Sequence, residues 1–374
     1  MKVMVTGGAG FIGSHVAQAA VDSGYEVLVV DDLSSGRTEN LPPEADFHPV
    51  DIRNRDALFE LAKHFRPDAI SHHAAQASVS VSVREPLKDA DVNIMGSLNV
   101  AELAVECGSR LIFASTGGAL YGEVADGERA GEDRPAQPMS PYACSKASFE
   151  LYLRAFAATS GLRFTILRYA NVYGPRQDPH GEAGVVAIFM QRLLAGEPIQ
   201  INARSREGDD GCVRDYMYVR DAVRANLAAF EGTLDGVTMN VATGIGITTR
   251  ELAERLVRLI DTPSLVNNGP HRAGDLECSV LDPTVMVSVL GEPTPLDRGL
   301  TATIEWFRSQ AEESRTSVSR WWGSGTWGFP WPSRLPGSSR VPSALTCRVL
   351  AWPRSTSSTT GRARSPKTIS VPRS

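Results

Sequence analysis

The chain opens with MKVMVTGGAGFIGSH (residues 1–15), and this stretch predicts how the rest of the chain is organised. Lys2–Thr6 is a short apolar run of the kind that a buried parallel strand needs. Glycines at the end of such a strand allow a tight turn, let the backbone approach a pyrophosphate and let the next helix pack on the sheet. The N-terminus of that helix presents free N–H groups to a phosphate. We therefore expect a bound dinucleotide rather than a purely structural turn, at the three glycines Gly7, Gly10 and Gly13.

The second expected strand, Glu26–Val30, ends at Asp31 and Asp32. An acidic residue about 20 positions after the glycine turn is where this pattern places a ribose-binding carboxylate. A carboxylate accepts hydrogen bonds from the ribose hydroxyls but repels a 2′-phosphate, so these residues favour NAD over NADP as the cofactor. The alternative interpretation is an aspartate that caps a helix or forms a turn.

Strand-like and helix-like segments alternate along the first half of the chain. This alternation predicts an α/β fold with a Rossmann-type doubly wound parallel sheet, whose ligands bind outside the carboxyl ends of the strands. Polar residues follow the strands as this arrangement requires, at Asp51, Gln76, Ser115, Thr116 and Asn171. The expected strands are Lys2–Thr6, Glu26–Val30, Phe47–Val50, Asp68–Ser71, Arg110–Ser115 and Arg163–Arg168, and the expected helices are Arg55–His64, Pro86–Cys107 and Pro141–Ser160.

Beyond Gly174 the alternation loosens, and long polar loops separate the expected helices. Such loops over a rigid α/β base are where substrate specificity usually resides. We therefore divide the chain into an NAD-binding domain at residues 1–175, to which some later segments return, and a smaller substrate-binding lobe at residues 176–313. The expected helices of the lobe are Val185–Ala195, Asp221–Phe230, Arg250–Ile260 after a capping box at Thr248 and Glu251, and a last one around Thr303–Ala311.

The composition of the 374 residues is that of an ordinary globular protein with a net charge of −5. This charge argues against a nucleic-acid partner, and no apolar stretch approaches the length of a membrane span. The five cysteines show no Cys-x-x-Cys spacing, so we expect neither a metal site nor a disulfide framework, and we expect a cytoplasmic protein.

Tyr142 and Lys146 lie four residues apart in an expected helix, so their side chains share one face, one turn apart. A tyrosine with an ordinary pKa near 10 is a poor base at neutral pH. A neighbouring ammonium favours the phenolate and makes it a useful general base. The alternative is an ordinary surface pair on a helix.

Ser115 and Thr116 end the fifth expected strand, and a hydroxyl there could pass a proton between Tyr142 and a substrate oxygen. The paired glycines that follow also suit a simple turn. Either hydroxyl could serve, so the choice between Ser115 and Thr116 stays open. His72 and His73 at the end of the fourth strand are interpreted as walls of the cofactor pocket.

Several motifs together resemble an extended short-chain dehydrogenase/reductase of the NAD-dependent epimerase/dehydratase family. They are TGGAGFIGSH, Asp31, Tyr142-x-x-x-Lys146, LRYANVYGPRQ and VRDYMYV, and within the family they are most similar to the UDP-glucose 4-epimerases over about residues 1–310. The resemblance implies an isomerase in which Tyr142 is the base, Lys146 holds the nicotinamide ribose and Thr116 is the hydroxyl partner. It also implies cofactor contacts by Gly7, Gly10, Phe11, Ile12, Gly13, Asp31, Asp32, Leu33, Ser34, Ser35, Gly36, Asp51, Ile52, His73, Ala74, Ala75, Gln76, Ala77, Asn93, Tyr142, Lys146, Tyr169 and Ala170.

The same resemblance implies a UDP-sugar substrate and a reaction through a transient 4-keto sugar. Gly117 and Gly118 stand where dehydratases carry an acidic residue, which disfavours dehydration, and the small Ser279 suggests UDP-GlcNAc as an additional substrate. The alternatives are a UDP-glucuronate 4-epimerase and a catalytically silent NAD-binding regulator. A homodimer is implied through Pro86–Cys107 and Pro141–Ser160. The implied substrate contacts are Asn171, Val185, Arg214, Arg272, Asp275 and Ser279.

Residues 314–374 match nothing in that family and contain no acidic residue. One interpretation is a disordered extension rich in Ser, Pro and Arg. The other is translation out of frame: residues 320–337 can be back-translated so that a shifted frame reads VVGLGYVGFPLAVALAG, which resembles the start of a nucleotide-sugar dehydrogenase. We assign this tail no function.

Overall fold

The computed structural model describes residues 1–179, 184–263, 265–272 and 274–323, with side chains described up to residue 312. Met1–Gly323 form one compact unit. Among the described residues, no helix combines the length and apolar character needed to cross a bilayer. The part of the predicted tail from residue 324 onward lies outside the described residues.

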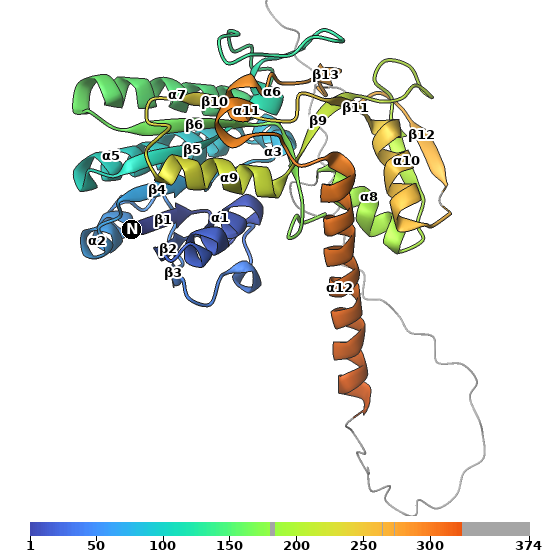
Figure 1. Ribbon diagram of the computed structural model, residues 1–374, viewed down its shortest axis with the longest axis horizontal. Coiled ribbons are helices and arrows are strands. Elements are labelled where there is room, and N and C mark those ends of the chain that lie inside the picture. The colour runs from blue at the N-terminus through green and yellow to red at the C-terminus, as the bar shows by residue number, and fades with distance from the viewer. Residues whose placement is uncertain (180–183, 264, 273, 324–374) are drawn as a thin grey trace, which may run out of the picture. The chain divides into compact units, whose positions relative to one another are not determined.

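A seven-stranded sheet forms the centre of the larger part of the molecule (Figure 1). All of its neighbouring strands are parallel, and their apolar side chains are buried on both faces. The chain runs from β1 to one edge at β3 and then returns to place β4 on the other side of β1, which makes the β1–β4 boundary the point where a ligand crevice is expected. The strand order is β10 (Thr238–Val241), β6 (Phe164–Tyr169), β5 (Arg110–Thr116), β4 (Ala69–His72), β1 (Lys2–Thr6), β2 (Glu26–Val30) and β3 (Asp46–His48).

Helices cover both faces of this sheet (Figure 1). On one face, α1 (Phe11–Asp22), α9 (Val219–Phe230) and α11 (Thr284–Leu290) contribute to a core with Val3, Val5 and Val29. On the other face, α2 (Arg55–Phe65), α5 (Ser97–Cys107) and α7 (Pro141–Ser160) pack in a second core that includes Met4 and Leu28. The predicted doubly wound α/β sheet is therefore confirmed.

A second group of elements forms a smaller lobe around a third apolar core. Its central strand β9 (Val213–Tyr218) pairs with β7 (Asn171–Tyr173), β11 (Gly246–Thr248) and β13 (Cys278–Ser279). The predicted capping box is present, because Thr248 and Glu251 each accept the other's backbone N–H at the start of α10 (Thr249–Ile260). The other elements of the lobe are α8 (Val185–Leu194), β8 (Ile199–Asn202), β12 (Val266–Gly269) and α12 (Leu296–Gly323).

Three expected segments show the main differences from the structure, and several others are shifted by one or two residues at an end. The third strand spans Asp46–His48 instead of Phe47–Val50, because it pairs only with β2 at the sheet edge. The single helix expected at Pro86–Cys107 is α4 (Pro86–Ala90), a π-helical segment η2 (Asp91–Gly96) and α5. The helix expected around Thr303–Ala311 is longer at both ends, as α12, and includes the first residues assigned to the tail.

Candidate active site

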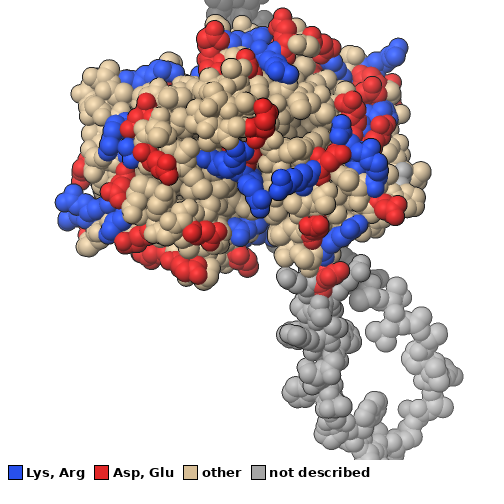
Figure 2. All heavy atoms as spheres, in the orientation of Figure 1, with Lys and Arg blue, Asp and Glu red and all other residues tan. Residues whose placement is uncertain are grey.

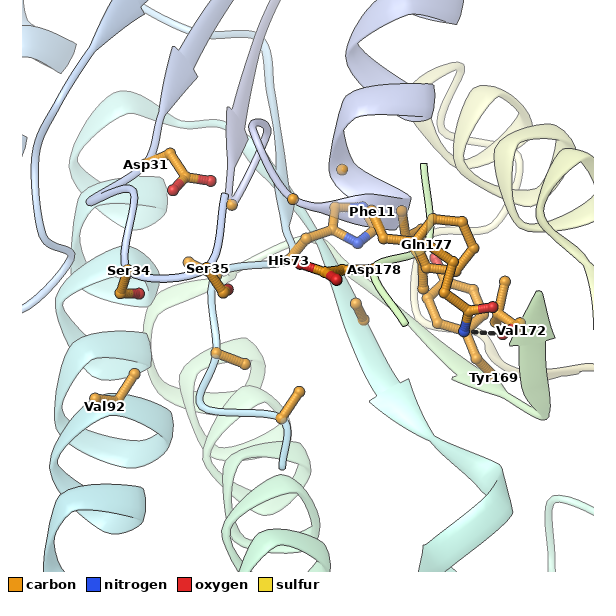
Figure 3. A pocket seen from close by; sticks show the side chains of 18 of the residues that line it. Phe11, Asp31, Ser34, Ser35, His73, Val92, Tyr169, Val172, Gln177 and Asp178 are labelled. Atoms are coloured by element: carbon orange, nitrogen blue, oxygen red, sulfur yellow. Dashed lines mark hydrogen bonds between the residues drawn. The ribbon is translucent and has the colours of Figure 1, made fainter. Parts of the chain in front are cut away.

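A pocket of about 580 Å³ opens at the carboxyl ends of the parallel strands, next to the first turn of α1 (Figure 3). Its lining comes from the ends of β1, β2, β5 and β6, from α7, and from the loops that follow β4 and β7. It contains most of the residues expected from the sequence: Gly7, Gly10, Phe11, Ile12, Gly13, Asp31, Asp32, Ser34, Ser35, Asp51, Ile52, His73, Ala74, Ala75, Ala77, Ser115, Thr116, Tyr142, Lys146, Tyr169, Ala170 and Asn171.

The glycine turn leaves no room for side chains. Gly7 has a positive φ of 71°, and a Cβ there would lie 2.5 Å from the backbone nitrogen of Ala74. A Cβ on Gly13 would lie 2.2 Å from the carbonyl oxygen of Gly7. The first turn of α1 consequently lies against the strand end with its backbone exposed to the pocket, and its N-cap Gly10 has no side-chain cap. These are the features that a helix N-terminus needs to bind a pyrophosphate.

Asp31 ties the glycine turn to the loop after β2. Its carboxylate accepts hydrogen bonds from the backbone N–H groups of Ala9 (3.0 Å) and Leu33 (2.8 Å). Burial raises the pKa of Asp31, although these two N–H groups oppose the shift. Leu33 and Gly36 do not line the pocket. A Cβ on Gly36 would lie 2.7 Å from Asp31 Oδ1, so both residues shape the loop around the carboxylate.

His73 and Tyr169 form an aromatic wall of the pocket, with stacked rings 6.3 Å apart (Figure 3). Asn226 on α9 donates to the Tyr169 hydroxyl (2.7 Å) and accepts from the Ser71 hydroxyl (2.8 Å), which in turn contacts His73 Nε2 (2.9 Å). Burial lowers the pKa of His73 to about 3, so the ring is neutral at physiological pH. His72 is buried between Thr6 and Ser97 and does not line the pocket.

Gln76 and Asn93 lie behind the pocket wall and not in its lining. The π-helical segment η2 turns Asn93 toward the loop after β4, where its amide exchanges hydrogen bonds with the Gln76 backbone at 2.8 Å each. Both side chains also donate to the buried Asp89. Gln76 and Asn93 therefore hold the loop that carries Ala74, Ala75 and Ala77 in place. A direct contact of Gln76 or Asn93 with a dinucleotide stays a prediction.

Tyr142 and Lys146 lie in the first turns of α7. The helix begins where Ser140 accepts the N–H of Ala143 and Pro141 occupies the first helical position. The Lys146 ammonium lies 6.0 Å from the Tyr142 ring centroid and donates a 2.9 Å hydrogen bond to the carbonyl oxygen of Ala114. Because Lys146 is buried and Tyr142 half-buried at the pocket wall, the two groups form one cation–phenol pair facing the pocket.

The two candidate hydroxyls at the end of β5 have different surroundings. The Ser115 hydroxyl donates a short 2.6 Å hydrogen bond to the buried carboxylate of Glu150 on α7. Thr116 follows it, and successive side chains of a strand point to opposite faces. Thr116 is half-buried at the pocket. The engagement of Ser115 with Glu150 therefore favours Thr116 as the hydroxyl that could reach a ligand.

Asn171 on β7 and Tyr216 on β9 lie directly opposite each other in register. Among the described residues, Asn171 Nδ2 and the Tyr216 hydroxyl are buried without a hydrogen-bond partner. Such groups are costly unless a ligand or water satisfies them. Asn171 was expected at the site from the sequence; Tyr216 was missed, although it stands within the VRDYMYV motif. Ser279 donates to the carbonyl oxygen of Gly118 (3.1 Å), and a Cβ on Gly118 would lie 3.5 Å from Asn171 Nδ2, so Ser279 belongs to the same cluster.

Of the expected substrate residues, only Asn171 lines the pocket. Five lie outside its lining: Val185, Arg214, Arg272, Asp275 and Ser279. Arg214 is in register with Ser279 and donates to the backbone of Val213 and Leu276. Arg272 and Asp275 are 4.0 Å apart on a surface loop. Their contacts with a substrate stay predictions.

The loop after β7 contributes pocket residues that the sequence did not single out. Gln177 donates from Nε2 to the carbonyl oxygen of Val172 (3.1 Å), whereas its Oε1 is buried without a partner (Figure 3). Asp178 forms a 2.6 Å ion pair with Arg37 from the loop after β2. The only sequence signal was the position of these residues in GPRQD, directly after a strand. Arg176 in the same loop, Gly184 before α8, and Arg37 and Asn40 in the segment after β2 also line the pocket and were not expected from the sequence.

On the face shown in Figure 2, Lys and Arg are interspersed with Asp and Glu. Among the residues that the structure describes, no group of three or more His, Cys, Asp and Glu side chains could hold a metal ion.

The fold and the site together define a nucleotide-binding enzyme of the short-chain type, and residues 3–242 match the NAD dependent epimerase/dehydratase family. The chain belongs to this family.

Among its relatives, the UDP-glucose 4-epimerase of Mycolicibacterium smegmatis is 41% identical over 320 residues, which cover 83% of this chain and 100% of that protein. A solved UDP-glucose 4-epimerase of Thermus thermophilus in complex with NAD is 48% identical, with a TM-score of 0.79 over 82% of this chain and 99% of that one. That of Thermotoga maritima with UDP-glucose is 46% identical, with a TM-score of 0.78 over 83% of this chain and 100% of that one.

Proposed function

We propose that this chain is an NAD-dependent UDP-glucose 4-epimerase, an isomerase that interconverts UDP-glucose and UDP-galactose through a 4-keto sugar. The observation that carries the proposal is the position of Tyr142 and Lys146 beside the end of β5, within the pocket that the glycine turn opens. The similarity to the UDP-glucose 4-epimerases supports it over most of the chain.

The pocket fits NAD on its own geometry. The glycine turn is closed to side chains, which leaves backbone for a pyrophosphate, and the Asp31 carboxylate suits the adenosine ribose better than a 2′-phosphate. Bound NAD would supply the hydride acceptor for a reversible oxidation at C4 of the sugar. We assign Phe11 and Ile12 to the pyrophosphate and Lys146 to the nicotinamide ribose.

In the proposed reaction Tyr142 takes the proton of the sugar 4-hydroxyl and later returns it. Lys146 stabilises the phenolate, because an ammonium within about 6 Å favours the charged form of a neighbouring acid. Thr116 hydrogen-bonds the same sugar oxygen and steers the proton. General acid–base catalysis by one positioned group contributes about 10²- to 10⁴-fold.

We place the UDP moiety against residues 176–313, with Arg214 and Arg272 at the diphosphate, since guanidinium groups pair with its oxygens. Asn171, Val185, Asp275 and Ser279 complete the proposed contacts. The buried, unpartnered Asn171 Nδ2 supports a polar ligand at this end of the pocket.

Turnover of UDP-GlcNAc is a second proposed activity. The small Ser279 supports it, as does a TM-score of 0.76 and 35% identity to a solved UDP-N-acetylglucosamine 4-epimerase of Methanobrevibacter ruminantium, over 83% of this chain and 98% of that one. Dehydration is disfavoured, because Gly117 and Gly118 open α6 (Gly117–Leu120) where an acidic residue would be needed.

The proposed enzyme is a cytoplasmic homodimer. Large apolar side chains are exposed on the segments expected to pair: Leu87 (85%), Met95 (57%), Leu151 (69%) and Tyr152 (44%). Val83 (62%) is exposed on the preceding short helix α3 (Val79–Arg84). A patch of this kind is typical of a protein interface. Light scattering on the eluting protein should give twice the chain mass, and a monomer with full activity would contradict the dimer.

The test of the proposed function is an assay of the purified full-length chain with UDP-glucose and no added NAD. We expect UDP-galactose to form, and we expect Tyr142→Phe to reduce turnover about 10²- to 10⁴-fold while NAD stays bound. A chain that holds NAD but interconverts no nucleotide-sugar would favour the silent regulator. Exclusive turnover of UDP-glucuronate would favour that epimerase instead.

A further inference from the structure

A buried carboxylate links the helix of Tyr142 to the strand of Thr116. Glu150 lies one turn after Lys146 on α7 and two turns after Tyr142, so the three side chains share one face of the helix. Its side chain is only 5% exposed. A carboxylate in such a position needs charge-assisted hydrogen bonds, because an uncompensated buried charge is strongly destabilising.

Its partners come from two adjacent strands. Ser115 on β5 and Arg168 on β6 are register partners, so their side chains lie side by side on the face that α7 covers. Ser115 donates to Glu150 Oε1 at 2.6 Å, and Arg168 donates to both carboxylate oxygens at 2.6 to 3.3 Å. Glu150 therefore links the ends of β5 and β6 to α7, the helix that carries Tyr142 and Lys146.

Arg168 is itself held by groups outside α7. Its Nη1 donates to the Tyr121 hydroxyl (2.7 Å) and to the carbonyl oxygen of Glu132 (3.0 Å), and Tyr121 donates to Asn240 Oδ1 (2.7 Å). Burial raises the pKa of Tyr121 to about 12, so the phenol stays neutral. Ser115, Glu150, Arg168 and Tyr121 are thus joined in one hydrogen-bonded network, and a satisfied buried network rigidifies its surroundings.

We propose that Glu150 is a positioning residue for the epimerase reaction, which acts by holding the Ser115 hydroxyl and thereby fixing Thr116 relative to Tyr142. The inference rests on the proposed function and adds a residue to it. Two fastenings one turn apart join α7 to β5: Lys146 to the carbonyl oxygen of Ala114, and Glu150 to the hydroxyl of Ser115. Thr116 is the next residue of the strand after Ser115, so the hydrogen bond between Glu150 and Ser115 also restrains the position of Thr116.

Two double variants of equal charge separate this role from simple stabilisation. Glu150→Gln/Arg168→Met removes the ion pair but keeps a carbonyl acceptor for Ser115. Glu150→Leu/Arg168→Met also removes that acceptor. Apolar replacement of a buried ion pair is often neutral for stability, so both variants should fold. The matched control is Arg110→Met/Asp235→Asn, which removes another ion pair (3.1 Å) at the opposite end of β5.

We expect Glu150→Leu/Arg168→Met to lower kcat about 10- to 100-fold with KM unchanged, because a misplacement of about 1 Å costs up to 10²-fold. Glu150→Gln/Arg168→Met should stay within about threefold of the wild type, since its acceptor is retained. The Arg110→Met/Asp235→Asn control should lose thermal stability without losing kcat. Equal kcat in the two Glu150 variants would overturn the proposal.

Ser115→Ala tests the same contact if the leucine variant shows no folding transition. It removes the hydroxyl from the strand side and should lower kcat about tenfold at constant KM. Wild-type kcat in Ser115→Ala would overturn the proposal. A wild-type chain without any epimerase activity would instead contradict the proposed function, so the two failures are distinguishable.

Discussion

The ammonium of Lys146 donates a 2.9 Å hydrogen bond to the carbonyl oxygen of Ala114, two residues before the end of β5. This contact joins the helix that carries Tyr142 to the strand that carries Thr116. It also places a buried cation 6.0 Å from the centre of the Tyr142 ring. One lysine therefore links the helix to the strand and holds a positive charge beside the proposed base.

Replacement of Lys146 by an apolar residue of similar length should impair the proposed base Tyr142 and leave the volume of the pocket unchanged. Lys146→Met keeps the length of the side chain but removes the ammonium, so we expect kcat to fall about 10²- to 10³-fold near neutral pH. The loss should shrink at alkaline pH, where the phenol ionises without help. Lys63→Met, at an exposed lysine paired with Glu60, is the control and should keep wild-type kcat at every pH. A pH-independent loss in Lys146→Met would contradict the electrostatic role.

Gly13→Ala should abolish retention of NAD. The new Cβ would lie 2.2 Å from the carbonyl oxygen of Gly7, and backbone at that distance has to move. Gly24→Ala is the control, because Gly24 has a φ of 77° with nothing within 4 Å of a Cβ. That variant should lose about 1 kcal/mol of stability but keep its cofactor. The NAD released by heat denaturation measures the cofactor content of both variants. Full NAD content in Gly13→Ala would show that the backbone contact between Gly13 and Gly7 is not needed for NAD binding.

NAD binding should weaken as pH falls, through Asp31. Burial raises the pKa of Asp31 above its ordinary value of 3.8, so the free folded protein binds this proton more tightly than the unfolded chain. The free protein therefore gains stability at Asp31 on acidification from neutral pH toward 3.8, whereas the ribose hydroxyls need the carboxylate as acceptor.

Asp31→Asn isolates this effect. We expect its NAD affinity at neutral pH to be about 10- to 100-fold below that of the wild type, with a shallower dependence on pH, because a hydrogen bond to a charged group is worth about 1.5–3 kcal/mol. Titration of the apoprotein with NAD between neutral and acidic pH provides the measurement. Wild-type affinity and pH dependence in Asp31→Asn would exclude the carboxylate from ribose binding.

The ion pair between Arg37 and Asp178 should slow the release of NAD. It joins the loops after β2 and β7, both of which line the pocket. An exposed pair is worth up to about 1 kcal/mol, so Asp178→Asn should speed release about two- to fivefold. Arg55→Gln breaks a comparably exposed pair with Glu102 away from the pocket and serves as the control. Equal release rates in all three proteins would show that the pair does not retain the cofactor.

Periodicity predicted the sheet and its helices well, because buried strands such as Glu26–Val30 are continuous apolar runs. It placed the edge strand at Phe47–Val50, whereas the strand ends at His48, since an edge strand has only one neighbour to set its length. The π-helical turn at Asp91–Gly96 was not predictable, because its apolar spacing is close to that of an α-helix.

Positions at the pocket were predicted best where a motif fixes both residue type and spacing, as for Tyr142 and Lys146. The choice between Ser115 and Thr116 was left open, although Leu111, Phe113 and Ser115 alternate on the buried face that α7 covers. Gln177 and Asp178 were missed because a long loop has no periodicity, and only the fold shows that it returns to the pocket.

The most direct test of the central claim follows the hydrogen at C4 of the sugar. The purified chain, without added NAD, is given UDP-glucose deuterated at C4, and the product is analysed by mass spectrometry and NMR. We predict UDP-galactose that retains the deuterium at C4, because the same hydride leaves and returns within one closed site. Product that carries solvent hydrogen at C4, or no product at all, would contradict epimerisation through a retained hydride.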